Sequence, residues 1–158
     1  MSGEYYQTLV DKFIFTVKKG FLYTDNETWV KIENGCVRVG VTDFFQRRGG
    51  DVIYIELPQV DSTVMRSEEI TQVETIKVVS SINSPVEGTI VEVNSTLTNK
   101  PEAINEDPYC KGWLVLISPS NLKKDTQQLF TAKRYFELMK KKIEDEMKRS
   151  KQEMGGLG

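Results

Sequence analysis

Trp29-Val30-Lys31-Ile32-Glu33-Asn34-Gly35-Cys36-Val37-Arg38-Val39-Gly40-Val41 is the stretch that decides the fold of this chain. Its centre, Asn34-Gly35, strongly favours a two-residue hairpin turn, because both residues tolerate a positive φ angle. After the turn, the valines of residues 37–41 alternate with Arg38 and Gly40. This two-residue period is typical of a strand with one buried face. The stretch therefore predicts a β-hairpin and favours a mainly β protein.

The strand pattern continues toward the C-terminus. Thr42-Asp43 offers an N-cap for a short helix over Phe44–Arg48, and Gly49-Gly50 ends that helix. Further strands are predicted where β-branched residues recur between turn residues. These strands cover residues 51–57, 89–93 and 113–117.

The two ends of the chain have a different pattern. In residues 1–20, apolar residues recur at spacings of three and four, which predicts a short amphipathic helix, with a strand through Phe13–Val17 as the alternative. Residues 131–154 predict a longer helix, in which an apolar residue recurs every four positions from Tyr135 to Met147. We expect this helix to dock at its start and to be solvated after Lys142, and a partner-binding helix is the alternative.

Length and composition exclude several classes of protein. The 158 residues suit one domain with a core, and a net charge of −2 indicates neither a nucleic-acid-binding nor a membrane-binding surface. The absence of histidine excludes serine–histidine catalysis and histidine zinc sites. Cys36 and Cys110 are predicted to be free thiols. Without a secretory signal pattern at its start, the chain is expected in the cytoplasm, or in the mitochondrial matrix if it is eukaryotic.

One lysine lies in an unusual setting. Lys77 lies in Val73-Glu74-Thr75-Ile76-Lys77-Val78-Val79, between two β-rich stretches, and Ser84-Pro85-Val86-Glu87-Gly88 follows. A turn with β-branched neighbours can hold one amine in solvent, where it can be acylated. Taken alone, the residue is an ordinary exposed lysine of a strand. The surrounding motifs change that interpretation.

These motifs occur in a fixed order from about Tyr23 to Phe136. The strings are Tyr23-Thr24 with Trp29-Val30, Val39-Gly40-Val41-Thr42-Asp43 with Gln46, Gly50-Asp51-Val52, Ile55-Glu56-Leu57-Pro58, Val73-Glu74-Thr75-Ile76-Lys77, Ser84-Pro85-Val86-Glu87-Gly88, Val91-Glu92-Val93-Asn94, and Ile104-Asn105-Glu106-Asp107-Pro108-Tyr109 with Gly112-Trp113-Leu114. In this order and spacing the chain resembles the H protein of the glycine cleavage system. This family consists of lipoyl carriers.

The resemblance implies a fold and a division of the chain. The fold would be mainly β, a flattened β-barrel or barrel-sandwich hybrid like that of lipoyl domains, with short helices and a C-terminal helix. Residues 1–20 would be an N-terminal extension, residues 21–136 the lipoyl-carrier domain, and residues 137–158 a C-terminal helical extension and tail.

The resemblance also implies a site and partners. Lipoate would be attached to Lys77, with Glu74 recognised by a lipoate ligase or lipoyltransferase. The arm would shuttle an aminomethyl group between the glycine decarboxylase (P-protein), the aminomethyltransferase (T-protein) and the dihydrolipoyl dehydrogenase (L-protein). The protein itself would have no catalytic or metal site and would be a carrier, not an enzyme. Biotin is a weaker alternative, because Lys77 lies between Ile76 and Val78, where biotinyl domains have methionines.

The chain departs from the family pattern before Trp29. The family has a glutamate there, which helps to hold the amine of the loaded arm, and this chain has Thr28 preceded by Glu27. Both are candidates for the arm pocket, although in a strand Glu27 would face away from Thr28. This departure leaves alternatives open. They are an H-like lipoate-binding protein that carries sulfur intermediates for a heterodisulfide-reductase-like complex, a lipoyl-relay protein, and a β-barrel that only binds and is never acylated at Lys77.

Overall fold

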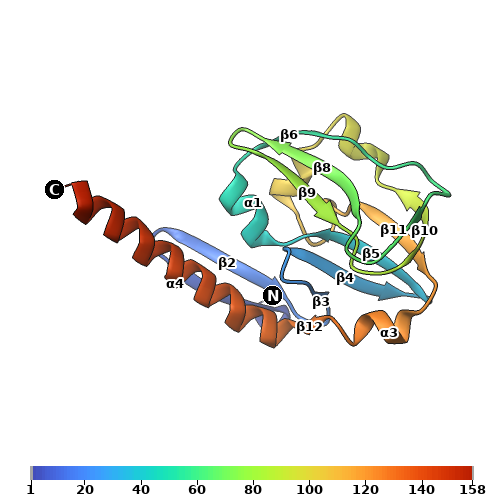
Figure 1. Ribbon diagram of the computed structural model, residues 1–158, viewed down its shortest axis with the longest axis horizontal. Coiled ribbons are helices and arrows are strands. Elements are labelled where there is room, and N and C mark those ends of the chain that lie inside the picture. Colours follow the sequence, from blue (N-terminus) through green and yellow to red (C-terminus); the bar gives the residue numbers. More distant parts are fainter. Residues whose placement is uncertain (1, 158) are drawn as a thin grey trace.

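The largest sheet of the protein has seven antiparallel strands and runs through the centre of the molecule (Figure 1). The structure, a computed structural model, describes residues 2–157. The strand order is β12-β3-β4-β5-β11-β10-β7. The strand bounds are β3 Leu22–Tyr23, β4 Thr28–Glu33, β5 Cys36–Val41, β7 Thr63–Val64, β10 Gly88–Val93, β11 Val115–Pro119 and β12 Phe130–Thr131.

A second, three-stranded sheet packs on this one. It consists of β6 (Val52–Ile55), β8 (Glu69–Thr75) and β9 (Val79–Asn83), in the order β6-β8-β9. One apolar cluster joins the two sheets, and it includes Val39 of the large sheet with Val73 and Ile82 of the small one. The predicted mainly β fold is confirmed. Among the described residues the strands enclose a common core as separate antiparallel sheets and do not form one closed barrel.

The predicted central hairpin and its helix are present. Glu33 pairs with Cys36 across the turn, where Asn34 and Gly35 have φ angles of 51° and 79°. Helix α1 (Asp43–Gly49) begins where the Thr42 side chain accepts a hydrogen bond from the Phe45 amide. The remaining short helices are η1 Ser2–Glu4, η2 Ser95–Thr98, α2 Ala103–Glu106 and α3 Leu122–Thr126.

The N-terminal segment differs from the first expectation. Instead of a helix, β1 (Tyr5–Val10) and β2 (Phe13–Lys18) form an antiparallel hairpin in which Val10 pairs with Phe13. The predicted helix is wrong and the alternative strand is confirmed. The spacing of the apolar residues fits both structures, but aromatic and β-branched residues pack better on a pleated surface. Asp11, with a φ of 53°, allows the tight turn.

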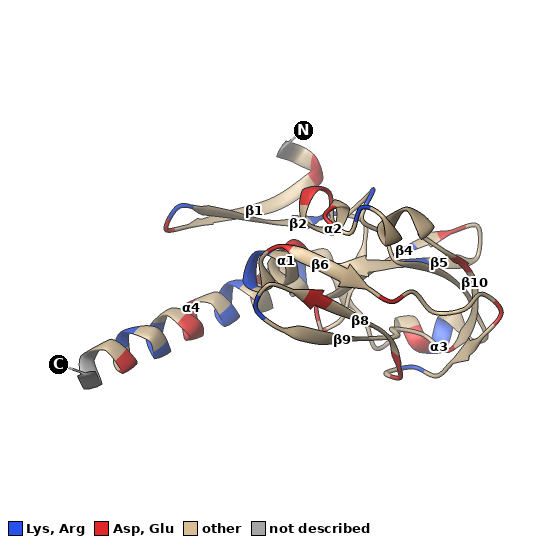
Figure 2. Cartoon of the chain, turned by 90° about the horizontal axis from the view of Figure 1, so that it is seen from above, with Lys and Arg blue, Asp and Glu red and all other residues tan. Residues whose placement is uncertain are grey.

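The predicted C-terminal helix is confirmed as α4 (Ala132–Leu157), which runs past residue 136 without a break. Tyr135, Met139 and Ile143 are buried, and from Lys148 onward the described side chains are exposed. Lysines, arginines and acidic residues cover the outward part of the helix (Figure 2). Within residues 2–157, the helices are all too short or too polar to cross a membrane.

An aromatic cluster attaches the N-terminal hairpin and α4 to the large sheet. The rings of Tyr6 and Phe136 stack at 5.3 Å between centroids, and those of Tyr23 and Tyr135 at 4.6 Å. Trp29 is fully buried in this cluster, and its indole Nε1 donates to the Pro108 carbonyl oxygen at 2.9 Å. The N-terminal hairpin and the first part of α4 therefore pack onto the large sheet.

Gly40 limits how Trp29 packs, which leads to a first prediction. Gly40 pairs with Trp29 across the β4–β5 ladder, and a Cβ atom at residue 40 would overlap the indole ring. We expect Gly40→Ala to lower the free energy of unfolding by about 1–3 kcal/mol, as overpacked cores do. Urea denaturation measures this change. Gly3→Ala is the matched control, since its Cβ would meet no atom within 4 Å. Equal stability of the two variants would contradict this account of the Trp29 contact.

Candidate functional site

Lys77 lies at the tip of the turn that joins β8 to β9, and its side chain is exposed. The Thr75 hydroxyl holds this turn in shape. Its Oγ1 lies 3.2 Å from the amide nitrogens of Lys77 and Val78, both of which donate to it, and it donates to the Val78 carbonyl oxygen at 3.1 Å. The lysine backbone is therefore held by local hydrogen bonds, while the amine extends beyond them.

Residues at and just after the C-terminal end of helix α1 accept hydrogen bonds from the turn that carries Lys77. The Ile76 amide donates to the Asp51 carbonyl oxygen at 3.0 Å, and the Lys77 Nζ donates to the Arg48 carbonyl oxygen at 3.3 Å. Gly50 has a φ of 76°, and a Cβ atom there would lie 3.2 Å from the Ile76 side chain. Glycine is therefore required for this close approach. Asn105 Nδ2 anchors the same loop by donating to the Gly50 carbonyl oxygen at 2.9 Å.

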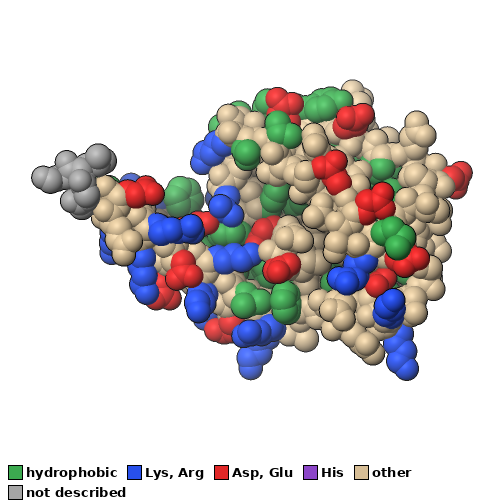
Figure 3. Space-filling view, in the orientation of Figure 1, with side chains coloured by type: hydrophobic (Ala, Val, Ile, Leu, Met, Phe, Trp, Pro, Cys, Tyr) green, Lys and Arg blue, Asp and Glu red, His purple; other side chains and the backbone are tan. Residues whose placement is uncertain are grey.

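Exposed hydrophobic side chains surround Lys77. They come from β6, from the turn and from the start of β9, and they are Ile53, Tyr54, Ile76, Val78 and Val79, each more than half exposed. Hydrophobic side chains are visible over β6 and β8 at the upper edge of the molecule (Figure 3). Exposed apolar residues that gather in one place typically mark a surface that contacts a partner. We call these five residues the apolar collar.

Glu74 lies at the edge of the same turn. It is the next-to-last residue of β8, opposite Val79 of β9 and Tyr54 of β6, and it is partly exposed. Glu74 and Lys77 are therefore close in space as well as in sequence. Strand β8, which bears Glu74, is held in place because it pairs with β6 on one side and with β9 on the other.

Glu27 is buried in the interior of the protein. Its φ angle is 66°, and it lies just before β4, which begins at Thr28. The expectation that Glu27 lies within a strand is therefore wrong, and its side chain is only 9% exposed. A buried carboxylate needs hydrogen-bond and charge partners. Those partners come from elements far away in the sequence.

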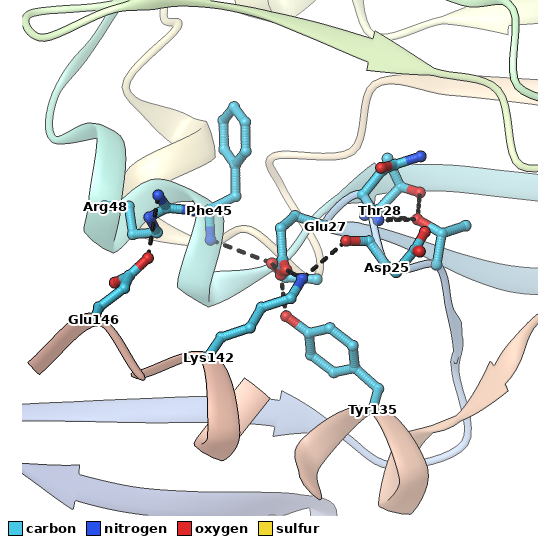
Figure 4. A network of polar contacts seen from close by, with 11 residues as sticks. Asp25, Glu27, Thr28, Phe45, Arg48, Tyr135, Lys142 and Glu146 are labelled. Atoms are coloured by element: carbon cyan, nitrogen blue, oxygen red, sulfur yellow. Dashed lines mark hydrogen bonds and ion pairs between the residues drawn. The ribbon is translucent and has the colours of Figure 1, made fainter. Parts of the chain in front are cut away.

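Figure 4 shows these partners of Glu27. The Thr42 hydroxyl donates to Oε1 at 2.8 Å, and the Lys142 Nζ donates to Oε2 at 2.7 Å. The Tyr135 hydroxyl also donates to Oε1. Burial, together with the adjacent carboxylate, raises the pKa of Tyr135 well above its usual value, so the phenol stays a donor.

A cavity of about 310 Å³ joins Glu27 to the Lys77 turn. Its lining residues are Glu27, Phe45, Arg48, Gly49, Val78 and Ser80. We call it the Glu27 cavity. Thr28 has a different position, because it is fully buried and its hydroxyl is hydrogen-bonded to that of Thr24 at 2.6 Å. Glu27 and Thr28 were both candidates for the arm pocket. Glu27 lines the cavity beside Lys77, and Thr28 does not.

Tyr135 and Lys142 were missed as site residues by the sequence analysis. The four-residue spacing placed Tyr135 on the buried face of the helix, but it carries no information on the partner of the hydroxyl. The C-terminal helix was expected to be solvated after Lys142, but the ammonium of Lys142 pairs with the carboxylate of Glu27. Neither contact has a signal in the sequence, since 108 residues separate Tyr135 from Glu27 and 115 separate Lys142 from it.

The described residues show no group of three or more acidic or cysteine side chains that could hold a metal ion. Cys36 and Cys110 are both free thiols, as predicted. This region therefore offers the exposed amine of Lys77 on a hydrogen-bonded turn. Beside it lies a cavity that is lined by the paired carboxylate of Glu27.

Comparison with known proteins identifies the family. The family model described as "Glycine cleavage H-protein" matches residues 21–142. A probable glycine cleavage system H protein of Pyrococcus abyssi is 42% identical over 127 residues, which cover 80% of this chain and 94% of the relative. The glycine cleavage system H protein of Geobacillus thermodenitrificans is 41% identical over 117 residues, with coverages of 74% and 91%.

A solved structure agrees with these relatives. The crystal structure of a glycine cleavage system H protein from Mycobacterium marinum superposes with a TM-score of 0.69 at 34% sequence identity, and the match covers 75% of this chain and 95% of that one. Together with the antiparallel sheets and the exposed Lys77 turn, these matches show that the chain belongs to the glycine cleavage H-protein family, the lipoyl carriers of the glycine cleavage system.

Proposed function

We propose that Lys77 is the residue that carries the lipoyl group, in amide linkage to its Nζ. The observation that carries this proposal is the position of Lys77 at the tip of a turn, exposed and, among the described residues, hydrogen-bonded through its amine only to the Arg48 carbonyl oxygen at 3.3 Å. An attaching enzyme can reach such an amine without unfolding any element. The adjacent Glu27 cavity, of about 310 Å³, offers room for part of the arm.

The chain's own residues hold and orient the arm. When bound, the lipoyl group supplies a disulfide whose sulfur accepts the carried group. Acylation removes the ammonium charge of Lys77, and the amide N–H that remains can still donate to the Arg48 carbonyl oxygen. The hydrogen bonds of Thr75 keep the base of the arm still. We propose that the protein has no catalytic site of its own, in keeping with its family.

The partner enzymes follow from membership in the glycine cleavage system. We propose that the apolar collar docks the glycine decarboxylase, the aminomethyltransferase and the dihydrolipoyl dehydrogenase in turn, and that a lipoate ligase or lipoyltransferase recognises Glu74. The relatives come from Pyrococcus and Geobacillus, organisms without mitochondria, which supports the cytoplasm as the compartment. The matched names do not favour the sulfur-carrying alternative.

We propose that Glu27 takes the part of the family's glutamate toward the loaded arm, whose end is a primary amine. Glu27 is a carboxylate on the wall of the cavity beside Lys77, whereas the Thr28 hydroxyl is engaged by Thr24. Lys142 now pairs with Glu27 through a side chain that is 38% exposed. That ammonium can move into solvent when another amine takes its place at the carboxylate.

The first test concerns Lys77. Lys77→Arg keeps the positive charge but offers no amine for acylation, so we expect the variant to gain no lipoyl mass from a lipoate-attaching enzyme. Intact mass and peptide mapping measure the modification. Lys31→Arg, at an exposed lysine on β4, is the matched control and should be lipoylated fully.

The consequence for function is tested with the purified partner enzymes. Glycine, the decarboxylase and the lipoylated protein should give an aminomethyl-loaded arm, and Lys77→Arg should give none. Loading of that variant, or residual glycine cleavage by it, would refute Lys77 as the attachment site.

Glu74 is tested in the same modification assay. If the attaching enzyme hydrogen-bonds this carboxylate, Glu74→Gln should slow lipoylation of Lys77 by about tenfold, the effect of losing one charge-assisted hydrogen bond. Glu92→Gln, at an exposed glutamate on β10, should leave the rate unchanged. Equal rates for the two variants would show that Glu74 is not recognised.

Glu27 is tested on the loaded protein. Without a carboxylate in the cavity, Glu27→Gln should lose the aminomethyl group about tenfold faster than the unchanged protein, since a charge-assisted hydrogen bond is again lost. Mass spectrometry of the loaded arm against time measures the lifetime. Thr28→Val should have little effect, because the Thr28 hydroxyl is bonded to Thr24. A shortened lifetime in Thr28→Val alone would reverse the two roles.

A further inference from the structure

A second cavity near Lys77 is lined almost entirely by hydrocarbon. It has a volume of about 200 Å³ and lies between β2, α1 and α4. Phe13 and Phe15 form its wall on the hairpin, Phe44 its wall on α1, and Ile143 its wall on α4. The rings of Phe15 and Phe44 are 6.0 Å apart between centroids. We call it the phenylalanine cavity.

The N-terminal hairpin builds half of this cavity. Phe13 and Phe15 lie on β2, before residue 21, where the match to the family begins. The part of the chain that matches the family supplies the wall on α1, and Ile143 of α4 lies just beyond the end of the match at residue 142. The phenylalanine cavity therefore depends on a segment that lies outside the family match.

Two features of the cavity indicate that it receives a small apolar group that is covalently attached to this protein. Phe13 is 54% exposed at its mouth, so hydrocarbon faces water where an apolar group could cover it at a gain in free energy. The cavity is also smaller than those that hold drug-sized molecules. A small apolar group on a tether fits both features.

Arg48 connects the cavity to Lys77. Its carbonyl oxygen accepts a hydrogen bond from the Lys77 Nζ at 3.3 Å, and its side chain lines the phenylalanine cavity. The guanidinium lies over the Phe44 ring, 5.2 Å from the centroid, and pairs with Glu146 at 3.1 Å. One arginine residue therefore spans the distance from the lysine amine to the rim of the cavity.

We propose that the dithiolane ring of an arm on Lys77 rests in the phenylalanine cavity while the arm carries no cargo. This inference rests on the proposed lipoylation of Lys77. The arm leaves the Nζ through an amide and four methylenes before it reaches the ring, which is enough chain to pass along the Arg48 side chain. The ring is uncharged, and its polarizable sulfurs pack well against the edges of aromatic rings.

The two cavities near Lys77 differ in how much of their lining is apolar. The Glu27 cavity has a carboxylate and an arginine on its walls and suits an arm that ends in an amine. The exposed lining of the phenylalanine cavity is mainly apolar and comes from three phenylalanines and Ile143, beside Arg47, Arg48 and Glu146. The empty arm, which has no charge to pair, is therefore expected at the hydrocarbon site.

The test measures how well the folded protein shields the ring. The full chain is lipoylated, and intact mass first confirms one lipoyl group on Lys77, so that a failure of modification is separated from a failure of this inference. A water-soluble phosphine then reduces the disulfide to the dithiol. The phosphine donates an electron pair as the S–S bond breaks, and one water supplies the two thiol protons and the oxygen of the phosphine oxide. A ring that is docked for about four-fifths of the time should react about fivefold more slowly than a lipoyl-lysine peptide.

The matched variants lie on the same hairpin. Phe13→Ala opens the wall of the cavity and should raise the reduction rate to that of the peptide. Leu9→Ala, at a residue of β1 that is 67% exposed and outside the cavity lining, should keep the fivefold protection. Reaction of the unchanged protein at the peptide rate would overturn the proposal, as would protection that persists in Phe13→Ala.

A direct measurement covers the case in which Phe13→Ala disrupts the hairpin. Nuclear Overhauser effects between the methylenes of the dithiolane ring and the ring protons of Phe13, Phe15 and Phe44 are expected in the unchanged lipoylated protein. They should disappear when the arm is loaded with the aminomethyl group. Contacts of the empty arm with Val78 and Ser80 of the Glu27 cavity, without contacts to the phenylalanines, would contradict the inference.

Discussion

The ion pair and hydrogen bonds of one buried carboxylate hold the functional end of this protein together. Glu27 is almost completely removed from water, and an isolated charge in that position would be very unfavourable. Thr42 stabilises it from the start of α1, and Tyr135 and Lys142 stabilise it from α4. The position of α4 on the carrier is therefore tied to the cavity beside the Lys77 turn.

The same network extends to Lys77 through a single short helix. Thr42, which donates to Glu27, also caps the N-terminus of α1, and the other end of that helix presents the carbonyl oxygen of Arg48 to the Lys77 amine. This seven-residue helix therefore connects the base of the proposed arm to the carboxylate that lines the Glu27 cavity. In a carrier of this kind the lipoyl arm is the flexible part, and the turn that bears Lys77 is held in place by its hydrogen bonds.

The hairpin and α4 form a second layer around this helix. They join the large sheet through aromatic stacking, with Tyr23 on Tyr135 and Tyr6 on Phe136. The whole hairpin lies before residue 21, where the family match begins, yet it contributes Phe13 and Phe15 to the surroundings of α1. Relatives that share only the carrier domain would present a different surface there, and so would offer the arm a different environment.

The Lys77 turn was predicted from motifs that extend from Tyr23 to Phe136. Local chemistry in the sequence was enough to predict the central hairpin, the helix between Thr42 and Gly50, and the C-terminal helix. In each case the deciding signals lie within a few residues of one another: a turn dipeptide, a cap, or a period of two or of about four. The N-terminal segment could not be assigned in this way, because its apolar spacing fits a helix and a strand equally well. Only tertiary packing decided between them. The same holds for Glu27, whose left-handed backbone and three partners depend on contacts between residues that are far apart in the chain. A sequence pattern records what each segment prefers by itself, whereas a buried charge is stabilised by whichever groups the complete fold brings to it.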